Sequence, residues 1–372
     1  MRMERTIDVI ASGHLCLDLI PQMDHVPLAA LSAPGKLYEI GPLAISTGGS
    51  VSNTGLALHR LGANVRLMAT VGDDLLGQII IAFLRERDPL LAEMIAIRQG
   101  HASSYTIVLS PEKVDRLFLH CTGTNAVFSA EDIDYHLLAA AKCFHLGYPP
   151  ILPALIANDG QKLAQLFRDA AQMGVLTSLD MALPDPGGAS GRANWPRILE
   201  RTLPHCDVFI PSLEEALFML RRREFDLWAA STPQMVSLAE LRAFADEILA
   251  LGPAIVGFKL GAFGIYIKTA PLSRMQAVSL ESFDCARWAD REIYHPAFSA
   301  NVVGTTGAGD AAYGGFLLAL LRGLPPEECA RWACAVGACN VEAADATSGV
   351  RSWDETSARL AEGWPLSAQR LK

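Results

Sequence analysis

The sequence predicts an α/β fold, with helices on both faces of a parallel sheet and a small second sheet at one end. Three observations predict it. Short apolar runs typical of strands alternate with amphipathic helical patterns along most of the chain. Gly62 and the pair Gly252-Pro253 stand where two of these helices should end. Residues 15–47 and 103–121 carry extended patterns that interrupt the alternation.

The elements of the larger sheet follow one another in order. We expect strands at residues 7–11, 65–71, 143–146, 175–179, 208–210 and 255–259. We expect helices at 54–61, 75–86, 131–141, 153–173, 213–221 and 237–250. Residues 184–195 and 222–236 are expected to be loops. No internal repeat divides the chain, and we expect residues 1–372 to form one domain.

Two segments are expected to form the smaller sheet. The first, 15–47, shows no helical pattern, and its short extended runs are separated by Pro21, Pro27, Pro34 and Pro42. The second, 103–121, predicts a β-hairpin with its turn near 111–113. A small sheet built from about 15–47 and 103–127 would be well placed to act as a lid over one end of the larger sheet.

Composition excludes several classes of protein. The chain has 372 residues, of which 51% are hydrophobic and 19% charged, so it can bury a large core and is not a disordered tail. Its formal net charge is −9 and its longest basic run is 221–223, which argues against nucleic acid or an anionic membrane as a partner. The apolar stretches, such as 316–321, are too short to span a bilayer. We therefore expect a soluble protein.

The cysteines indicate a reducing compartment. The eight are scattered and include no C-x-x-C pair, so a structural zinc site is not expected. Each lies among apolar residues, where a free thiol behaves as a small buried hydrophobe. We expect a cytoplasmic location.

The segment 301–316 carries the strongest chemical signal. Two threonines and a Gly-Ala-Gly turn at 307–309 lead through Asp310 into an apolar helix. Glycines let a backbone approach a ligand closely, and the first N–H groups of a helix attract anions. Asp310 would face that anion and could accept a proton from an incoming hydroxyl group. For the bare G-x-G-D pattern, a tight turn followed by an ordinary helix acid is the simpler interpretation, but the full segment is more specific.

A second glycine-rich segment lies near the N-terminus. Gly48 and Gly49 stand where the expected lid joins the first long helix, a place where a hinge would be useful. Asn53 falls in the first turn of that helix and would point back toward the lid. Alone, the segment fits a glycine turn followed by helix capping equally well.

Together the two segments resemble the two signatures of the PfkB, or ribokinase-like, carbohydrate kinase family. The resemblance extends over roughly residues 7–353. It implies a three-layer α/β/α sandwich with a β-sheet lid. It also implies transfer of the γ-phosphoryl group of ATP to a hydroxyl, usually the CH2OH of a sugar or nucleoside, with Mg2+. Phosphoryl transfer depends mainly on positioning and charge stabilisation, which agrees with the chemistry expected of segment 301–316.

The resemblance implies roles for the motif residues. Asp310 would be the catalytic base, and the backbone of Gly307, Ala308 and Gly309 the anion hole for the transferred phosphoryl group. The substrate pocket would be formed by Asp18, Gly48, Gly49 and Asn53, with Asn125 approaching from the lid side. The residues implied on the nucleotide side are Lys259, Gly261, Gly264, Thr306 and Asn340.

Two acids are candidates near the metal and phosphates. Glu215 takes the acid position of the family's N-x-x-E element, which organises Mg2+, while Ser212 replaces the asparagine. Serine keeps an oxygen but lacks the amide donors, and a plain helix N-cap would explain Ser212 equally well. Asp180 follows a predicted strand, where open α/β sheets collect ligands, and fits either metal binding or a turn cap. For Lys259, an ordinary surface lysine at a strand end is almost as good an interpretation.

The sequence departs from the family at a potassium-dependent loop. Gly304 stands where the family usually has Asp, which in K+-activated members supports a cation loop together with the second threonine, here Thr306. The partner loop has Asp345 where glycine is common. Activation by K+ would be absent, or rebuilt with Asp345 as a ligand.

Several functions remain open from the sequence. The leading one is an ATP-dependent kinase acting on a sugar or sugar derivative, with a nucleoside kinase as an alternative. A catalytically silent sugar- or nucleotide-binding protein is a second alternative, although such a protein needs neither Asp310 nor the 307–309 turn. A dinucleotide-dependent oxidoreductase lacks its fingerprint, because Gly13-His14-Leu15 follows the first strand in place of G-x-G-x-x-G. Apolar lid faces would also suit a homodimer in which two lids clasp.

Overall fold

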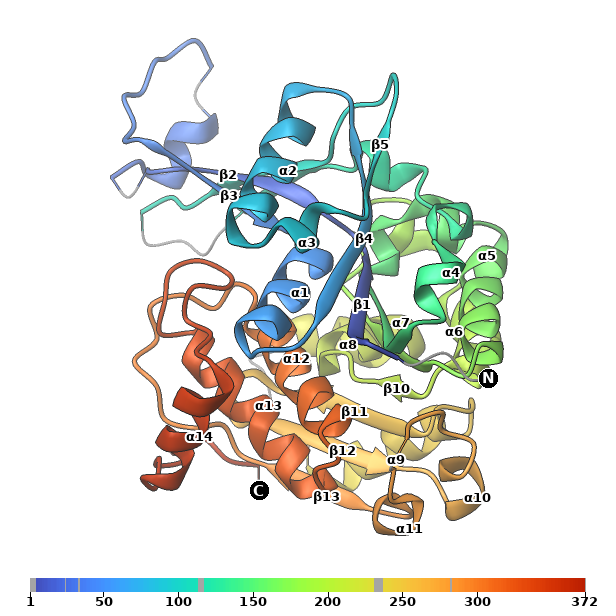
Figure 1. Ribbon diagram of the computed structural model, residues 1–372. Coiled ribbons are helices and arrows are strands. Elements are labelled where there is room, and N and C mark those ends of the chain that lie inside the picture. The colour runs from blue at the N-terminus through green and yellow to red at the C-terminus, as the bar shows by residue number, and fades with distance from the viewer. Residues whose placement is uncertain are drawn as a thin grey trace.

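A computed structural model of the chain describes residues 5–23, 25–32, 34–112, 117–230, 237–281 and 283–371. Within these residues the strands form two sheets (Figure 1). The larger has nine strands in the order β13-β12-β11-β10-β9-β8-β1-β4-β5, and the smaller has four in the order β3-β2-β6-β7. The predicted α/β class with a second, smaller sheet is confirmed.

The larger sheet is parallel over most of its width. Its strands are β1 (Ile7–Gly13), β4 (Val65–Gly72), β5 (Ile95–Arg98), β8 (Ala141–Gly147), β9 (Leu176–Asp180), β10 (Val208–Phe209), β11 (Ile255–Lys259), β12 (Ile265–Thr269) and β13 (Glu292–His295). From β11 to β5 every neighbouring pair is parallel. The pairs β11–β12 and β12–β13 are antiparallel. The short connection between β11 and β12 explains the exception, since a parallel crossover needs a dozen or more residues.

Helices cover both faces of this sheet, and β1 shows how. Val9 and Ala11 pack into one core cluster, with residues of α1 (Ser50–Arg60), α12 (Ala308–Leu321) and α13 (Pro326–Asn340). Ile10, on the opposite face, belongs to the other cluster, with residues of α5 (Pro153–Gln172), α7 (Leu213–Leu220) and α9 (Leu238–Leu249). The alternation of side chains along one buried strand therefore separates two helical layers.

The other helices are shorter or lie at the edges. They are α2 (Leu75–Arg87), α3 (Pro89–Ala92), α4 (Tyr135–Leu138), α6 (Trp195–Thr202), α8 (Arg222–Ala230), α10 (Leu272–Met275), α11 (Cys285–Trp288) and α14 (Trp353–Ala361). Within the described ranges, no helix is both long and apolar enough to cross a membrane. All eight cysteines are free thiols, and six of them are buried.

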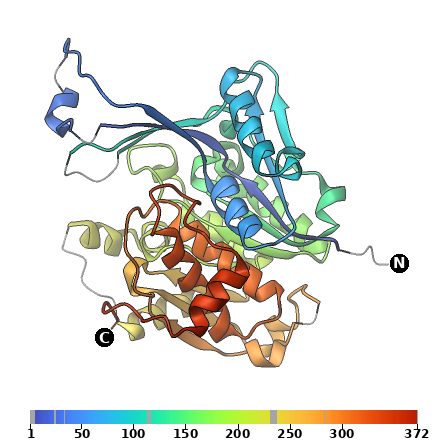
Figure 2. The ribbon, with the colours of Figure 1, turned by 60° about the vertical axis from the view of Figure 1, so that its left-hand side comes forward.

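The smaller sheet combines the two predicted β segments. It consists of β2 (Cys16–Pro21), β3 (Leu43–Gly48), β6 (Tyr105–Leu109) and β7 (Leu117–Cys121). The expected hairpin is the antiparallel pair β6–β7, and β6 pairs in parallel with β2. Figure 2 shows this sheet reaching outward from the body. The turn expected near 111–113 extends into residues outside the described ranges.

Three local predictions were wrong. The helix expected at 131–141 is only the four-residue α4 preceded by a turn at Ala130–Asp132, because β8 already begins at Ala141 and pairs with Ile7 of β1. Residues 222–230, expected as a loop, form α8, while 231–236 lie outside the described ranges. The first long helix begins at Ser50, four residues before the predicted start.

Candidate active site

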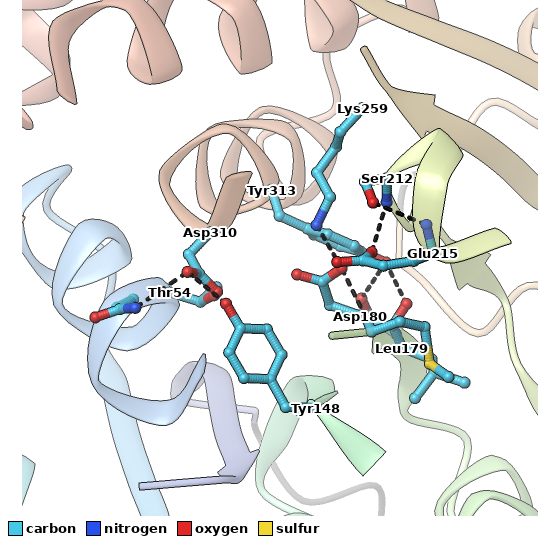
Figure 3. A network of polar contacts seen from close by, with 12 residues as sticks. Thr54, Tyr148, Leu179, Asp180, Ser212, Glu215, Lys259, Asp310 and Tyr313 are labelled. Carbon is cyan, nitrogen blue, oxygen red and sulfur yellow. Dashed lines mark hydrogen bonds and ion pairs between the residues drawn. The ribbon is translucent and has the colours of Figure 1, made fainter. Parts of the chain in front are cut away.

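The candidate site lies where the carboxyl ends of the central strands meet two helix N-termini. Strands β1, β8, β9 and β11 end at Gly13, Gly147, Asp180 and Lys259, beside the first turns of α1 and α12 (Figure 3). Glycine is required at the end of β1, because a Cβ on Gly13 would lie 2.4 Å from the carbonyl oxygen of Gly147. Open α/β sheets bind ligands at this edge.

The first turn of α12 has the geometry of an anion site. Gly307 precedes the helix with φ +72°, a left-handed conformation suited to glycine, and a Cβ there would lie 2.4 Å from the carbonyl oxygen of Ala346. The first N–H groups of a helix have no intrahelical partners and carry partial positive charge. Gly309 faces Lys259, whose Nζ would lie 3.6 Å from a Cβ on Gly309. The Lys259 ammonium therefore lies beside the first turn of α12, where the Ala308 N–H donates to the Thr305 carbonyl over 3.3 Å.

Asp310 is buried in this first turn, at 3% exposure, and three side chains hold its carboxylate. The Tyr148 hydroxyl donates to Oδ2 over 2.8 Å, and the Asn53 amide donates to the same oxygen over 3.1 Å. The Thr54 hydroxyl donates to Oδ1 over 3.2 Å. Asn53 and Thr54 belong to the first turn of α1, so this helix and α12 meet at the carboxylate (Figure 3).

A buried ion pair adjoins Asp310. Lys259 Nζ donates to Asp180 Oδ1 over 2.5 Å, and the two side chains are 12% and 0% exposed. Burial raises the pKa of Asp180, an effect that the Lys259 ammonium opposes. Burial alone would lower the pKa of Lys259, but the carboxylates of Asp180, Glu215 and Asp310 outweigh it and raise that pKa above its usual value. Lys259 is therefore buried, and the alternative that it is an ordinary surface lysine at a strand end is wrong.

Glu215 approaches the same ion pair from α7. Ser212 and Glu215 form a capping box: the Ser212 N–H donates to Glu215 Oε2 over 2.7 Å, and the Glu215 N–H donates to Ser212 Oγ over 3.1 Å. Burial raises the pKa of Glu215, again opposed by Lys259. Ser212 therefore acts as an N-cap and fixes the Glu215 side chain at the same time.

Asp18 lies on β2 of the smaller sheet, against the two early glycines. A Cβ on Gly48 would lie 2.2 Å from Asp18 Oδ2, and a Cβ on Gly49, which has φ +87°, would lie 2.4 Å from His14 Nδ1. Gly49 must be glycine because of its φ and because a Cβ there would also lie 2.5 Å from the His14 carbonyl oxygen, whereas a larger residue at position 48 would displace the Asp18 carboxylate. Burial raises the pKa of Asp18 to about 6. Neither ring nitrogen of the buried His14 has a hydrogen-bond partner among the described residues.

Two predicted site residues, Asn125 and Asn340, form hydrogen bonds with the backbone of loops next to the site. Asn125 is fully buried, and its amide bonds both backbone groups of Leu15, donating to the carbonyl over 2.8 Å. Asn340 is also fully buried and donates to the Thr306 carbonyl over 3.0 Å. The family resemblance places Asn125 on the lid side of the substrate pocket and Asn340 on the nucleotide side. In the structure the amide of Asn125 braces the β1–β2 connection, and that of Asn340 braces the loop before Gly307.

Other positions singled out from the sequence lie in three loops. Gly261 and Gly264 both have positive φ in the β11–β12 turn, and a Cβ on Gly264 would lie 2.0 Å from the carbonyl oxygen of His295. Gly304 packs against the carbonyl oxygens of Ala343 and Ala344, each 2.9 Å from a Cβ built there. Asp345 Oδ1 accepts from the N–H groups of Thr347 and Ser348 over 2.8 and 2.6 Å. That oxygen caps its own loop.

The prediction did not include Tyr148 and Thr54, although both touch Asp310. Tyr148 had one available signal, since it directly follows a predicted strand and carboxyl ends of parallel strands gather ligand-binding residues. Thr54 had none, because a threonine in an apolar helix pattern usually satisfies its own helix. Tyr148 acts through its contact with Asp310, which lies 162 positions away in the sequence, and no local sequence pattern predicts such a contact.

Comparisons with known proteins identify the family of this chain. The pfkB family carbohydrate kinase model matches residues 8–353. A sugar kinase of Archaeoglobus fulgidus is 26% identical over 298 residues, covering 79% of this chain and 98% of that protein. The 2-dehydro-3-deoxygluconokinase of Bacillus subtilis is 24% identical over 336 residues, covering 90% and 91%. Arabidopsis thaliana ribokinase, solved with ribose and ATP, has the same fold, with a TM-score of 0.72, 17% identity and coverage of 95% and 98%. The chain therefore belongs to the pfkB family of carbohydrate kinases, which are phosphotransferases.

Proposed function

We propose that the protein transfers the γ-phosphoryl group of Mg-ATP to a hydroxyl, most simply a CH2OH, of a sugar or sugar derivative. One observation carries the proposal: a buried carboxylate, Asp310, stands in the first turn of α12, next to the glycine turn and within reach of the Asp180–Lys259 pair. A proton acceptor beside an anion site is what transfer to an alcohol requires.

In the proposed step the acceptor hydroxyl gives its proton to the Asp310 carboxylate. Its oxygen forms a bond to the γ-phosphorus of ATP while the bond between that phosphorus and the oxygen that leaves with ADP breaks. The backbone N–H groups of Gly307, Ala308 and Gly309 stabilise the charge on the transferring group. Lys259, directed at the same turn, adds a fixed positive charge. Gly261, Gly264 and Thr306 would border the nucleotide, with Asn340 holding the Thr306 loop in place.

The residues present fit Mg2+. Asp180 Oδ2 is buried and has no hydrogen-bond partner among the described residues, which leaves it open to a cation. No group of three or more His, Cys, Asp or Glu side chains in the described ranges could hold a metal by itself. Mg2+ in kinases usually takes one or two carboxylates together with phosphate oxygens and water. Asp180 and Glu215 would hold the ion, which neutralises phosphate charge when bound.

The substrate pocket would use the smaller sheet as a lid. Asp18, fitted against Gly48, would grip substrate hydroxyls, and Oδ1 of the Asn53 amide has no partner among the described residues while its nitrogen holds Asp310. Carboxylate and amide groups suit the neighbouring hydroxyls of a sugar. The two relatives described above are named as kinases of a sugar and of a sugar acid, which supports a sugar or sugar derivative as the acceptor.

Two finer features belong to the same proposal. Asp345 Oδ1 is committed to its own loop and Gly304 brings no side chain, so we expect turnover without a K+ requirement. Leu37, Phe118 and Leu119 are 86%, 57% and 56% exposed on the smaller sheet and its connection, which favours a homodimer formed through the lids. Light scattering of the full chain would give the mass of that dimer.

The test is ADP release from Mg-ATP across neutral hexoses and pentoses, sugar acids and nucleosides, in K+ and in Na+ buffer, with the product identified by mass spectrometry. We expect one sugar or sugar acid to gain a single phosphoryl group at similar rates in both buffers. A nucleoside product would replace the sugar proposal with the nucleoside alternative. ATP binding without any phosphorylated product across the panel would favour the silent binding protein.

A further inference from the structure

Tyr148 is held in a backbone conformation that few side chains adopt. Its φ and ψ are 65° and 46°, the left-handed region, which is unfavourable for a residue other than glycine. The neighbouring structure imposes this conformation. The Tyr148 N–H donates to the Asp180 carbonyl over 3.1 Å, its carbonyl accepts from the Ile151 N–H over 3.1 Å, and Pro149 and Pro150 follow directly.

This backbone turn directs the phenol at Asp310. β8 ends at Gly147, and the left-handed residue that follows places the Tyr148 hydroxyl 2.8 Å from Asp310 Oδ2 (Figure 3). The ring stacks against His14, with centroids 6.1 Å apart and planes at 26°. Burial raises the pKa of Tyr148 well above its usual value, and the charges of Asp310 and Asp180 raise it further. The phenol therefore keeps its proton and is a donor throughout the working pH range.

The two oxygens of Asp310 are unequally occupied. Within the described part of the chain, Oδ2 accepts two hydrogen bonds, from Tyr148 and Asn53, whereas Oδ1 accepts one, from Thr54, at the longer distance of 3.2 Å. A carboxylate oxygen has two lone pairs, so Oδ2 is full and Oδ1 has one lone pair left. The occupied oxygen cannot take a proton without losing a donor.

We propose that Tyr148 is a positioning residue: together with Asn53 it holds Oδ2 of Asp310, so that Oδ1 is the atom that receives the proton of the substrate hydroxyl. This inference rests on the proposed kinase function and specifies which atom acts in it. The proton passes from the acceptor hydroxyl to Oδ1, and the Tyr148 proton stays on the phenol. The strained backbone at residue 148 is retained because it directs the phenol at this carboxylate.

The test compares Y148F with Y313F. Tyr313 is a matched control: it lies one turn from Asp310 on α12, is buried, and its hydroxyl donates to the Leu179 and Val208 carbonyls and not to Asp310. With the sugar found in the panel, we expect Y148F to lower kcat about 10-fold or more with KM for sugar and ATP within about twofold, since the lost contact acts through the base.

Y313F should leave kcat near the wild-type value, even if its unfolding temperature falls. Equal kcat losses in both variants would reduce Tyr148 to a structural residue. A wild-type kcat in Y148F would overturn the inference.

A second measurement does not depend on turnover, so it separates this inference from the kinase proposal. In protein carrying 13Cγ-labelled aspartate, with D310N identifying the Asp310 signal, we expect the chemical shift of that signal to change in Y148F and to stay near the wild-type value in Y313F, because only Tyr148 donates to Asp310 Oδ2. An unchanged chemical shift in Y148F would overturn the inference even in an active enzyme. A changed chemical shift in a protein that phosphorylates nothing would support the contact and reject the kinase.

Discussion

Lys259 donates a hydrogen bond over 2.5 Å to Asp180, 79 positions away, and both side chains are buried. The charges of Glu215 and Asp310 also act on Lys259, so one ammonium group faces three carboxylates and the surroundings of the pair carry net negative charge. A nucleoside triphosphate without Mg2+ would add further negative charge to this site, whereas its Mg2+ complex brings compensating positive charge.

The pair should be needed for both stability and turnover. K259M keeps most of the side chain's apolar length but leaves Asp180 and Glu215 buried without their cation. We expect the free energy of unfolding to fall by about 3 kcal/mol and kcat to fall at least 100-fold, because one partner of a buried pair is lost together with a charge at the anion site. Urea unfolding and the ADP assay measure the two effects.

The matched control for this variant is K268M. Lys268 lies on β12 and pairs with Asp246, whose side chain is 55% exposed, outside the candidate site. A solvent-exposed pair contributes little, so K268M should change stability by less than about 1 kcal/mol and leave kcat unchanged. If K259M behaved like K268M, Lys259 would have no special place in the site.

Asp18 should make sugar binding depend on pH. Its pKa of about 6 means that acid below this value protonates the carboxylate and removes its charge and one acceptor position. We expect kcat/KM to fall as pH drops through about 6, and D18N to raise KM for the sugar about 10-fold or more while removing that limb of the profile. A D18N enzyme with wild-type KM would exclude Asp18 from the pocket.

Ionised Asp18 should lower the free energy of unfolding at neutral pH. In the unfolded chain Asp18 ionises near pH 3.9, below its folded value of about 6, so the folded state loses stability as pH rises between the two values. D18N avoids this loss. We expect it to be about 2 kcal/mol more stable than the wild type at pH 8, with the difference shrinking toward zero near pH 4, as measured by urea unfolding at the two pH values. A destabilised D18N at pH 8 would contradict the assigned burial cost.

Glu215 should set the Mg2+ requirement. E215Q keeps the size of the side chain and its capping-box geometry with Ser212 but removes one negative charge. We expect a lower kcat at 1 equivalent of Mg2+ per ATP, partly restored at about 10 mM free Mg2+, because a weakened ion site is filled by mass action. E214Q, on the neighbouring residue of the same helix turn, is the control. If kcat depended on Mg2+ concentration in the same way in E215Q and E214Q, Glu215 would have only its capping role.

Much of the fold could be predicted from the sequence because its signals are local. The alternation of strands and helices, the hairpin at 103–121 and the glycine turn before Asp310 are each encoded within a few residues. The expected helix at 131–141 failed because pairing of Ala141 with β1 overrode its helical pattern. The antiparallel edge of the larger sheet was missed because β12 and β13 were not recognised as strands.

The site was predictable only in part, because the contacts between its side chains join residues far apart in the sequence and are not encoded by local patterns. Asp310 and Asn53 sit in motifs, and the structure brings their side chains within 3.1 Å. Asn125 and Asn340 also sit in motifs, yet their amides bond to Leu15 and Thr306, since sequence position does not set the direction of a side chain. Tyr148 carries no motif, and its contact with Asp310 depends on one left-handed residue at the end of β8.

D310N tests most directly whether Asp310 is the base of a sugar kinase. The amide keeps the size of the side chain but cannot take a proton from an alcohol. With the acceptor found in the panel, we expect D310N to lose turnover about 1,000-fold or more while binding Mg-ATP within about threefold of the wild type by calorimetry. Near-native sugar phosphorylation by D310N would exclude Asp310 as the base.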